Sequence, residues 1–174
     1  MSGRHEELLE LLDKSGAELF ALLTRLTLRQ DVAEELMQEL FIKLSHSRGP
    51  NKVTNWDAYA RRAAVNLAFD WRRCRKRAEP RLEQVREQAP NDESPLGKLI
   101  HSEELAETLD AIERLNKASR QVLVMRYIEQ KSYDDIAEQL GKSSHHVRTL
   151  CSRAMSRLRD ILGCNHRQLS QKEM

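Results

Sequence analysis

Residues 132–162 combine a tight turn with a run of basic side chains, and this segment carries most of the chemistry visible in the chain. Ser132 and Asp135 have the spacing of a capping box, with Asp in place of the usual Glu or Gln, ahead of a short amphipathic pattern. Gly141 supplies the backbone freedom that ends a first helix. The segment predicts a helix-turn-helix, whose second helix can enter the major groove of DNA.

The second helix of this motif has two contrasting faces, and either Ser143 or Ser144 can cap it. Its apolar residues recur at intervals of three and four and predict one buried stripe: Val147, Leu150, Cys151, Ala154, Leu158, Ile161 and Leu162. Its polar face carries His145, Arg148, Thr149, Ser152, Arg153, Ser156 and Arg157. The alternative is a plain surface hairpin with a solvated charged face, which the coincidence of cap, glycine and basic face disfavours.

The distribution of charge says more than its total, because the 174 residues carry a net charge of only +2. Basic residues dominate in 61–81 and again in 142–167, whereas acidic residues collect in 6–18, 31–39 and 92–113. Basic surfaces separated by acidic ones indicate one partner that is nucleic acid and another that is not.

Other classes of protein find little support. The three cysteines form no CxxC pair and no metal-ligand spacing, which favours a reducing cytosol and no metal site. Residues 1–12 are charged throughout, unlike a secretion signal, and no apolar run reaches the roughly 18 residues of a membrane span. We find no phosphate-binding glycine loop, nucleophile–base pattern or paired carboxylates. We expect a cytoplasmic protein that is not an enzyme, needs no cofactor and has no membrane contact.

The fold class predicted is all-α, because no segment shows the sustained alternation of a strand. Prolines and turn residues in 79–99 predict a linker between two small helical domains, at 1–78 and 100–165. The first domain should hold three helices, from about 5 to 28, from a D-x-x-E start at Asp31, and from Trp56 to about Arg77. In the second, two helices should pack on the C-terminal helix-turn-helix.

Three segments in this order resemble a known family: DVAEELMQELFIKL, NWDAYARRAAVNLAFDWRRCRKR and LDAIERLNKASRQVLVMRYIEQKSYDDIAEQLGKSSHHVRTLCSRAMSRLR. Together they are similar to a bacterial RNA polymerase sigma factor of the extracytoplasmic-function (ECF) type, over about residues 17–162. The resemblance implies a dissociable promoter-specificity subunit with its region 2 domain at 1–78 and its region 4 domain at 100–165. It implies core RNA polymerase (the β′ coiled coil and the β flap) and promoter DNA as partners, with an anti-sigma factor as a further one.

The resemblance implies that the helix beginning at Asp31 docks on the polymerase β′ coiled coil. Carboxylates on one face, with an exposed leucine and glutamine, suit a basic helical partner. The alternative is a solvated acidic face over the local core, with Phe41 inside that core. The residues that match the family pattern are Asp31, Glu34, Glu35, Leu36, Gln38 and Glu39.

The resemblance places the helix beginning at Trp56 at the −10 promoter element, where strand opening needs neutralised phosphates. Asp70 could equally be the structural partner of a neighbouring arginine. Trp56 and Trp71 lie on the apolar stripe, so we expect core anchors rather than stacking platforms. The residues implied at the −10 element are Asn66, Asp70, Arg72 and Arg73.

The resemblance places the helix-turn-helix at the −35 element, where first-turn residues reach base edges and flanking residues hold phosphates. His145 and His146 stand where the family often has small residues, and adjacent positions on a helix make them a poor metal pair. The expected base contacts are His145, His146, Arg148 and Thr149, and the expected phosphate contacts are Lys142, Ser144, Ser152 and Arg153.

Two other functions compete with this interpretation. A stand-alone helix-turn-helix regulator would bind duplex DNA tightly without polymerase and form a dimer on spaced half-sites. An adaptor would cover a polymerase surface without promoter activity. The basic helix that contains Asn66, Asp70 and Arg73 argues against both, because neither function needs a second DNA-facing helix.

Overall fold

A computed structural model describes residues 2–46, 55–82 and 95–172, and every regular element within these ranges is helical. The predicted all-α class is therefore confirmed. Most of the predicted linker lies outside the described residues. None of the described helices is both long and apolar enough to cross a membrane. In chain order the elements are α1 (Ser2–Thr27), α2 (Gln30–His46), α3 (Trp56–Leu82), α4 (Pro95–Glu113), α5 (Lys117–Leu123), the π-helical turn η1 (Val124–Ile128), α6 (Tyr133–Leu140) and α7 (Ser144–Lys172).

The first three helices pack around a leucine-rich core. α1 is continuous across Gly16, because its leucines keep the helical spacing along its length and pack on α2 and α3. It ends where Leu28 adopts a left-handed conformation at φ 60°. α2 then begins at Gln30, and Asp31 lies inside its first turn. The Arg29 side chain donates to the Asp31 carboxylate there, at 3.1 Å from Nε, so an ion pair replaces the predicted capping box.

The helices at the middle of the chain are longer than predicted. α3 continues past Arg77 and through Pro80 to Leu82. Pro80 has no amide hydrogen to donate to the Lys76 carbonyl, so the last turns of α3 lack that backbone hydrogen bond. α4 begins at Pro95, because a proline fits the first position of a helix. Regular structure therefore occupies both ends of the segment predicted as linker.

The helix-turn-helix prediction is confirmed in its details. Ser132 and Asp135 form the reciprocal capping box, and Gly141 ends α6 in a left-handed conformation at φ 62°. Ser143, rather than Ser144, caps α7, since its Oγ accepts a hydrogen bond from the His146 amide at 3.2 Å. The stripe of α7 is buried at Val147, Cys151, Ala154, Leu158 and Ile161 and half-buried at Leu150 and Leu162.

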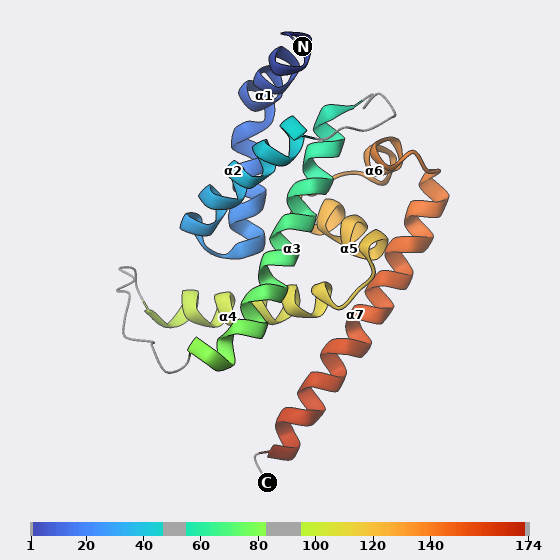
Figure 1. Ribbon diagram of the computed structural model, residues 1–174. Coiled ribbons are helices and arrows are strands. Elements are labelled where there is room, and N and C mark those ends of the chain that lie inside the picture. The colour runs from blue at the N-terminus through green and yellow to red at the C-terminus, as the bar shows by residue number, and fades with distance from the viewer. Residues whose placement is uncertain (1, 47–54, 83–94, 173–174) are drawn as a thin grey trace.

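The two helical units lie against each other through α3. Figure 1 shows α3 (green) with α1 and α2 on one side and α5 on the other, while α4 crosses its lower part. Buried apolar side chains from both units form one continuous cluster, and the Arg120 guanidinium of α5 lies 4.9 Å from the ring centre of buried Phe69 in α3. In the described chain, helices of both units therefore pack against α3.

We predict that Ile136→Ala destabilises the helix-turn-helix. Ile136 is 0% exposed where α6 meets the core, and an Ile-to-Ala change in such a site costs about 2–5 kcal/mol. Urea denaturation followed by circular dichroism would measure the loss. Glu138→Ala, at an exposed position of the same helix, is the control and should change the free energy of unfolding by less than about 0.5 kcal/mol. Equal stability of the two variants would contradict the packing.

Candidate nucleic-acid interface

The first half of α7 and the turn before it form a polar surface directed to solvent. Of the eight residues predicted to contact the −35 element, six are exposed and two, Ser144 and Thr149, are half-buried. The Ser144 hydroxyl donates to the Asp134 carboxylate, and the Thr149 hydroxyl donates to the His145 carbonyl at 3.0 Å. These two hydroxyls are therefore engaged within the protein. The exposed six are Lys142, His145, His146, Arg148, Ser152 and Arg153.

One cation of this surface, Arg148, lies over the aromatic ring of Tyr133. The Arg148 guanidinium lies 5.5 Å from the ring centre of Tyr133, at the start of α6, and the Arg126 guanidinium lies 4.6 Å from the same centre. Arg126 is held in turn, because it donates to the Lys131 carbonyl at 2.8 Å. The half-buried ring thus joins η1, α6 and α7, and cation–π attraction favours one orientation of Arg148. Sequence reasoning missed Tyr133.

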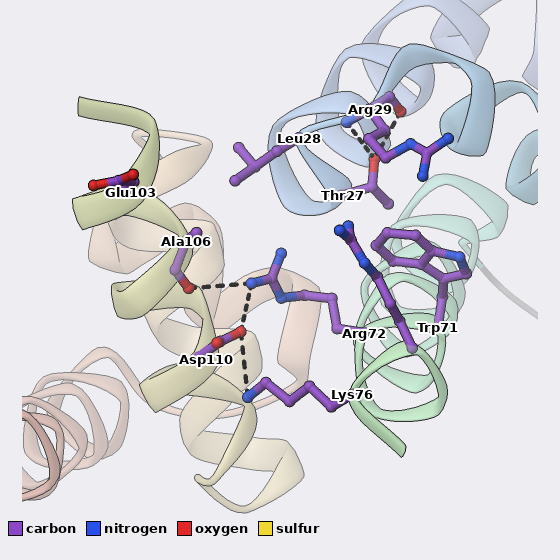
Figure 2. Close-up of a pocket in the computed structure, with 10 residues that line it drawn as sticks. Thr27, Leu28, Arg29, Trp71, Arg72, Lys76, Glu103, Ala106 and Asp110 are labelled. Carbon is purple, nitrogen blue, oxygen red and sulfur yellow. Dashed lines mark hydrogen bonds and ion pairs between the residues drawn. The ribbon is translucent and has the colours of Figure 1, made fainter. Parts of the chain in front are cut away.

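Arg72 does not belong to an exposed DNA-facing surface. It is 7% exposed and bridges three elements: Nη1 donates to the Leu26 carbonyl at 3.2 Å, and Nη2 donates to the Ala106 carbonyl at 3.1 Å and to Asp110 Oδ1 at 2.6 Å. In this arrangement of the chain the two Nη groups of Arg72 are engaged within the protein, and Figure 2 shows the contacts with Ala106 and Asp110. The contact of Arg72 with the −10 element stays a prediction.

The other −10 candidates also have partners within the chain. Asn66 is half-buried, and its side-chain oxygen accepts a hydrogen bond from Gln121 Nε2 at 3.4 Å. Asp70 is exposed and lies 3.5 Å from Arg73, which supports its structural role beside an arginine. Arg73 also reaches Glu113 of α4 at 3.4 Å. The four predicted residues do share α3, but three of them contact the second unit.

The tryptophans pack as predicted, against the edge of the core. Both are half-buried. Trp56 Nε1 donates to Glu7 at 3.0 Å. Trp71 lines a cleft of about 410 Å³ between the α1–α2 turn, α3 and α4. The Arg75 guanidinium lies 5.5 Å from the Trp71 ring centre. Figure 2 shows this cleft, with Arg72 and Lys76 directed from α3 toward Asp110.

A second hollow, of about 250 Å³, lies between α3, α5 and the helix-turn-helix. Asn66 of α3 and Lys142 of the turn both line it, together with Arg62 and Lys117. The two surfaces assigned to different promoter elements therefore face each other across a single hollow in the described chain.

α2 presents an acidic face, but with a different apolar residue from the one predicted. The expectation that Leu36 is exposed is wrong. Leu36 is 5% exposed, because it lies on the buried apolar stripe of α2 together with Val32, Leu40 and Leu44. Ile42, 56% exposed, takes its place on the outer face. Phe41 is half-buried against the core. The exposed polar residues of this helix include Asp31, Glu34, Glu35, Gln38 and Glu39.

Arg61 is the centre of a mostly buried ion network between the units. It pairs with Glu129 at 2.6 Å, with Asp57 at 2.9 Å, and with Glu18. Burial disfavours its charge, but hydrogen bonds with the three carboxylates outweigh this effect and raise the pKa of Arg61. Lys131 lies 3.5 Å from Glu129, and burial lowers the pKa of Lys131. Arg61 therefore stays charged and ties α1, α3 and the second unit together.

The cysteines do not suggest a metal centre. Cys151 is buried, as its place on the apolar stripe predicted, and Cys74 is exposed. Within the described residues, no three His, Cys, Asp or Glu side chains gather in a geometry that could hold a metal ion.

The fold and its surfaces define a two-part helical protein with a helix-turn-helix and a second basic helix. Comparison with protein families names the class: residues 11–78 match the Sigma-70 region 2 family, and residues 105–158 match the Sigma-70, region 4 family. The chain belongs to the bacterial sigma factors of the ECF type.

Individual relatives agree with this assignment. The chain is 35% identical to the RNA polymerase sigma-E factor of Streptomyces coelicolor over 106 residues, which are 61% of this chain and 57% of that protein. It is 28% identical to the ECF RNA polymerase sigma factor SigE of Mycolicibacterium smegmatis over 166 residues, 93% of this chain and 64% of that protein. The matches thus span less than two thirds of these relatives' lengths.

A solved structure shares this fold. The structure of CnrH in complex with the cytosolic domain of CnrY is similar at a TM-score of 0.51 and 20% identity, covering 94% of this chain and 92% of that chain. The sigma factor RpoE of Bartonella quintana, solved with the anti-sigma factor NepR, gives a TM-score of 0.49 at 21% identity, over 94% of this chain and 98% of that chain.

Proposed function

We propose that this protein is a dissociable promoter-specificity subunit of RNA polymerase. The observation that carries the proposal is the pairing of an exposed basic recognition helix, α7, with a second basic helix, α3, in a separate sigma-70 region. A regulator that only binds duplex DNA needs the first of these and not the second.

In this role each surface has a distinct partner. The start of α7 reads the −35 element, with Arg148 at a base edge and Lys142 and Arg153 at phosphates. α3 contacts the −10 element through Asn66 and Arg73, and neutralises backbone phosphates while the strands separate. The chemistry of RNA synthesis belongs to the polymerase, so the protein itself is not an enzyme.

The acidic face of α2 is the proposed contact with core polymerase. Carboxylates at Glu35 and Glu39 surround an exposed apolar residue, Ile42, which suits a basic helical surface with an apolar centre. We further propose that the protein works in the cytoplasm. An anti-sigma factor is its proposed regulator, like the one bound to the Bartonella quintana protein.

Association with core polymerase tests the proposal. The labelled protein should bind purified core enzyme from the same bacterium, and a housekeeping sigma factor should displace it. Tight binding to duplex DNA in the absence of polymerase, without any association with the core enzyme, would instead favour a stand-alone regulator.

Tyr133 should position Arg148 for the −35 contact. We expect Tyr133→Leu to weaken binding of the holoenzyme to −35 duplex by several-fold, since a cation–π contact is worth about 0.5–2 kcal/mol. Tyr133→Phe keeps the ring and should bind like the wild type. In an Arg148→Ala background the Leu substitution should add nothing. A further loss in that background would show that Tyr133 acts through folding rather than through Arg148.

A further inference from the structure

The hollow of about 250 Å³ between α3, α5 and the helix-turn-helix is strongly positive. Arg62 lines it from α3, Lys117 from the start of α5, and Lys142 from the turn before α7. None of the described residues that line the hollow is acidic. Within residues 2–46, 55–82 and 95–172, none of these three cations forms an ion pair. The hollow therefore gathers three positive charges, and no carboxylate of the described chain offsets them.

The larger cleft beside Trp71 differs from this hollow in its charge balance. Two of its cations are paired, since Asp110 lies 2.6 Å from Arg72 and 3.3 Å from Lys76. In the smaller hollow the like charges of three side chains repel one another, and an anion among them would turn this repulsion into attraction. Of the two cavities, the smaller one therefore favours an anionic ligand.

The backbone around the smaller hollow is fixed at each of its three cations. The Arg62 carbonyl accepts a hydrogen bond from Gln121 Nε2 at 3.2 Å, which ties α5 to α3. Lys117 is the first residue of α5, directly after a capped N-terminus. The Lys142 amide donates to the Ala137 carbonyl at 2.9 Å and closes the turn after α6. A ligand therefore has to order only the side chains, which lowers the entropic cost of binding.

One amide and two leucines complete the lining. The side-chain oxygen of Asn66 accepts from Gln121 Nε2 at 3.4 Å, so its amide nitrogen provides the donors that an anion requires. Leu140 and Leu150 are half-buried and line another part of the hollow. Apolar walls lower the local dielectric constant and strengthen the attraction between an anion and the three cations.

The size of the hollow favours a compact ligand. Its volume equals that of about eight molecules of liquid water. It is smaller than the roughly 300 Å³ at which pockets for drug-sized molecules begin. Arginine and lysine bind phosphate oxygens through short, charge-assisted hydrogen bonds. Three cations on three different elements suit an ion that carries several such oxygens and is small enough to lie among them.

We propose that this hollow binds a compact polyphosphate anion of the size of inorganic pyrophosphate, held jointly by Arg62, Lys117 and Lys142. Binding of the anion is measured on the full chain alone, without polymerase or DNA. A failure of pyrophosphate to bind would therefore leave the proposed function standing, and a failure of the protein to bind core polymerase would leave the anion site standing.

Isothermal titration calorimetry with sodium pyrophosphate, at fixed ionic strength and without magnesium, tests the site. We expect one ion to bind per protein. Inorganic phosphate should bind about tenfold more weakly or less tightly still, because a single phosphate cannot span all three cations. ATP should bind no more tightly than pyrophosphate, since its nucleoside would lie outside the hollow. Absence of saturable binding, equal affinity for phosphate, or tighter binding of ATP would overturn the assignment.

The site variant is Arg62→Gln with Lys117→Gln, which leaves the proposed −35 contact Lys142 in place. Its matched control, Lys43→Gln with Arg157→Gln, removes one lysine and one arginine at exposed positions outside the hollow. The site variant should bind pyrophosphate about tenfold more weakly or worse, because it loses two hydrogen bonds to a charged ligand. The control should stay within about twofold of the wild type. Equal weakening in both variants would show that net charge governs binding, and would overturn the site.

Nuclear magnetic resonance locates the ion in the wild-type protein, so this measurement holds even where a variant fails to fold. On titration with pyrophosphate, the ¹H–¹⁵N signals of the Asn66 side-chain amide and of the Lys117 and Lys142 backbone amides should move together with occupancy. The backbone signals of Lys43 and Arg157 should stay in place. Shifts that are largest outside the hollow would overturn the proposed location.

Discussion

Arg148→Ala should lower the affinity of the holoenzyme for −35 duplex by about tenfold or more, because a side chain that reads a base edge contributes about 1–3 kcal/mol of discrimination. The exposed guanidinium stands one turn into α7, stacked on Tyr133. Fluorescence anisotropy with duplexes that differ at single base pairs would measure the effect. The variant should discriminate less between base pairs at one or two positions of the −35 duplex, while its affinity for core polymerase stays unchanged.

Arg157→Ala is the matched control for this prediction. Arg157 is also exposed on α7, but it lies more than two turns farther along the helix and on its other flank. Its loss should weaken binding slightly and equally for all sequences. If Arg148→Ala weakened binding without changing the order of preferred sequences, Arg148 would be a phosphate contact and not a base contact.

Replacing Glu35 and Gln38 together by alanine should weaken binding to core polymerase by about tenfold or more, since central residues of an interface cost about 2 kcal/mol or more when truncated. Both lie on the outer face of α2, beside exposed Ile42. The dissociation constant for core enzyme should rise, and the wild-type affinity should itself fall with salt. Binding of the variant to DNA should not change.

Glu6→Ala with Glu10→Ala is the control for this docking surface. Both residues are exposed on α1 in the same unit. Their loss alters net charge without touching the outer face of α2, so affinity for core polymerase should change little. Equal weakening by the two double variants would mean that overall charge, and not the α2 face, governs the association.

Local signals made the helix-turn-helix predictable. Ser132, Asp135 and Gly141 fix the ends of α6 through contacts within a few residues, and the spacing of Val147 and Cys151 fixes the buried side of α7. These features need no knowledge of the rest of the chain. The sequence could therefore predict both the motif and its exposed face.

The exposure of a side chain was predicted wrongly where the prediction followed the family pattern, or where contacts with residues distant in the sequence determine burial. Leu36 was assigned to the docking face by resemblance, although its own spacing from Val32 and Leu40 places it in the core. Arg72 looked exposed on α3, but its partner Asp110 is 38 residues away in the sequence. No local sequence pattern predicts such an ion pair, because the pair depends on how α4 packs on α3. The same holds for Arg61 and Glu129.

Run-off transcription on fragmented genomic DNA, with purified core RNA polymerase from the source bacterium, tests the central claim most directly. We predict discrete transcripts that require both the core enzyme and this protein, with start sites downstream of a shared pair of sequence elements. The Glu35 and Gln38 variant should give few of them, and the Glu6 and Glu10 variant should match the wild type. Absence of any transcript that depends on this protein, with an active core enzyme present, would contradict its role as a promoter-specificity subunit.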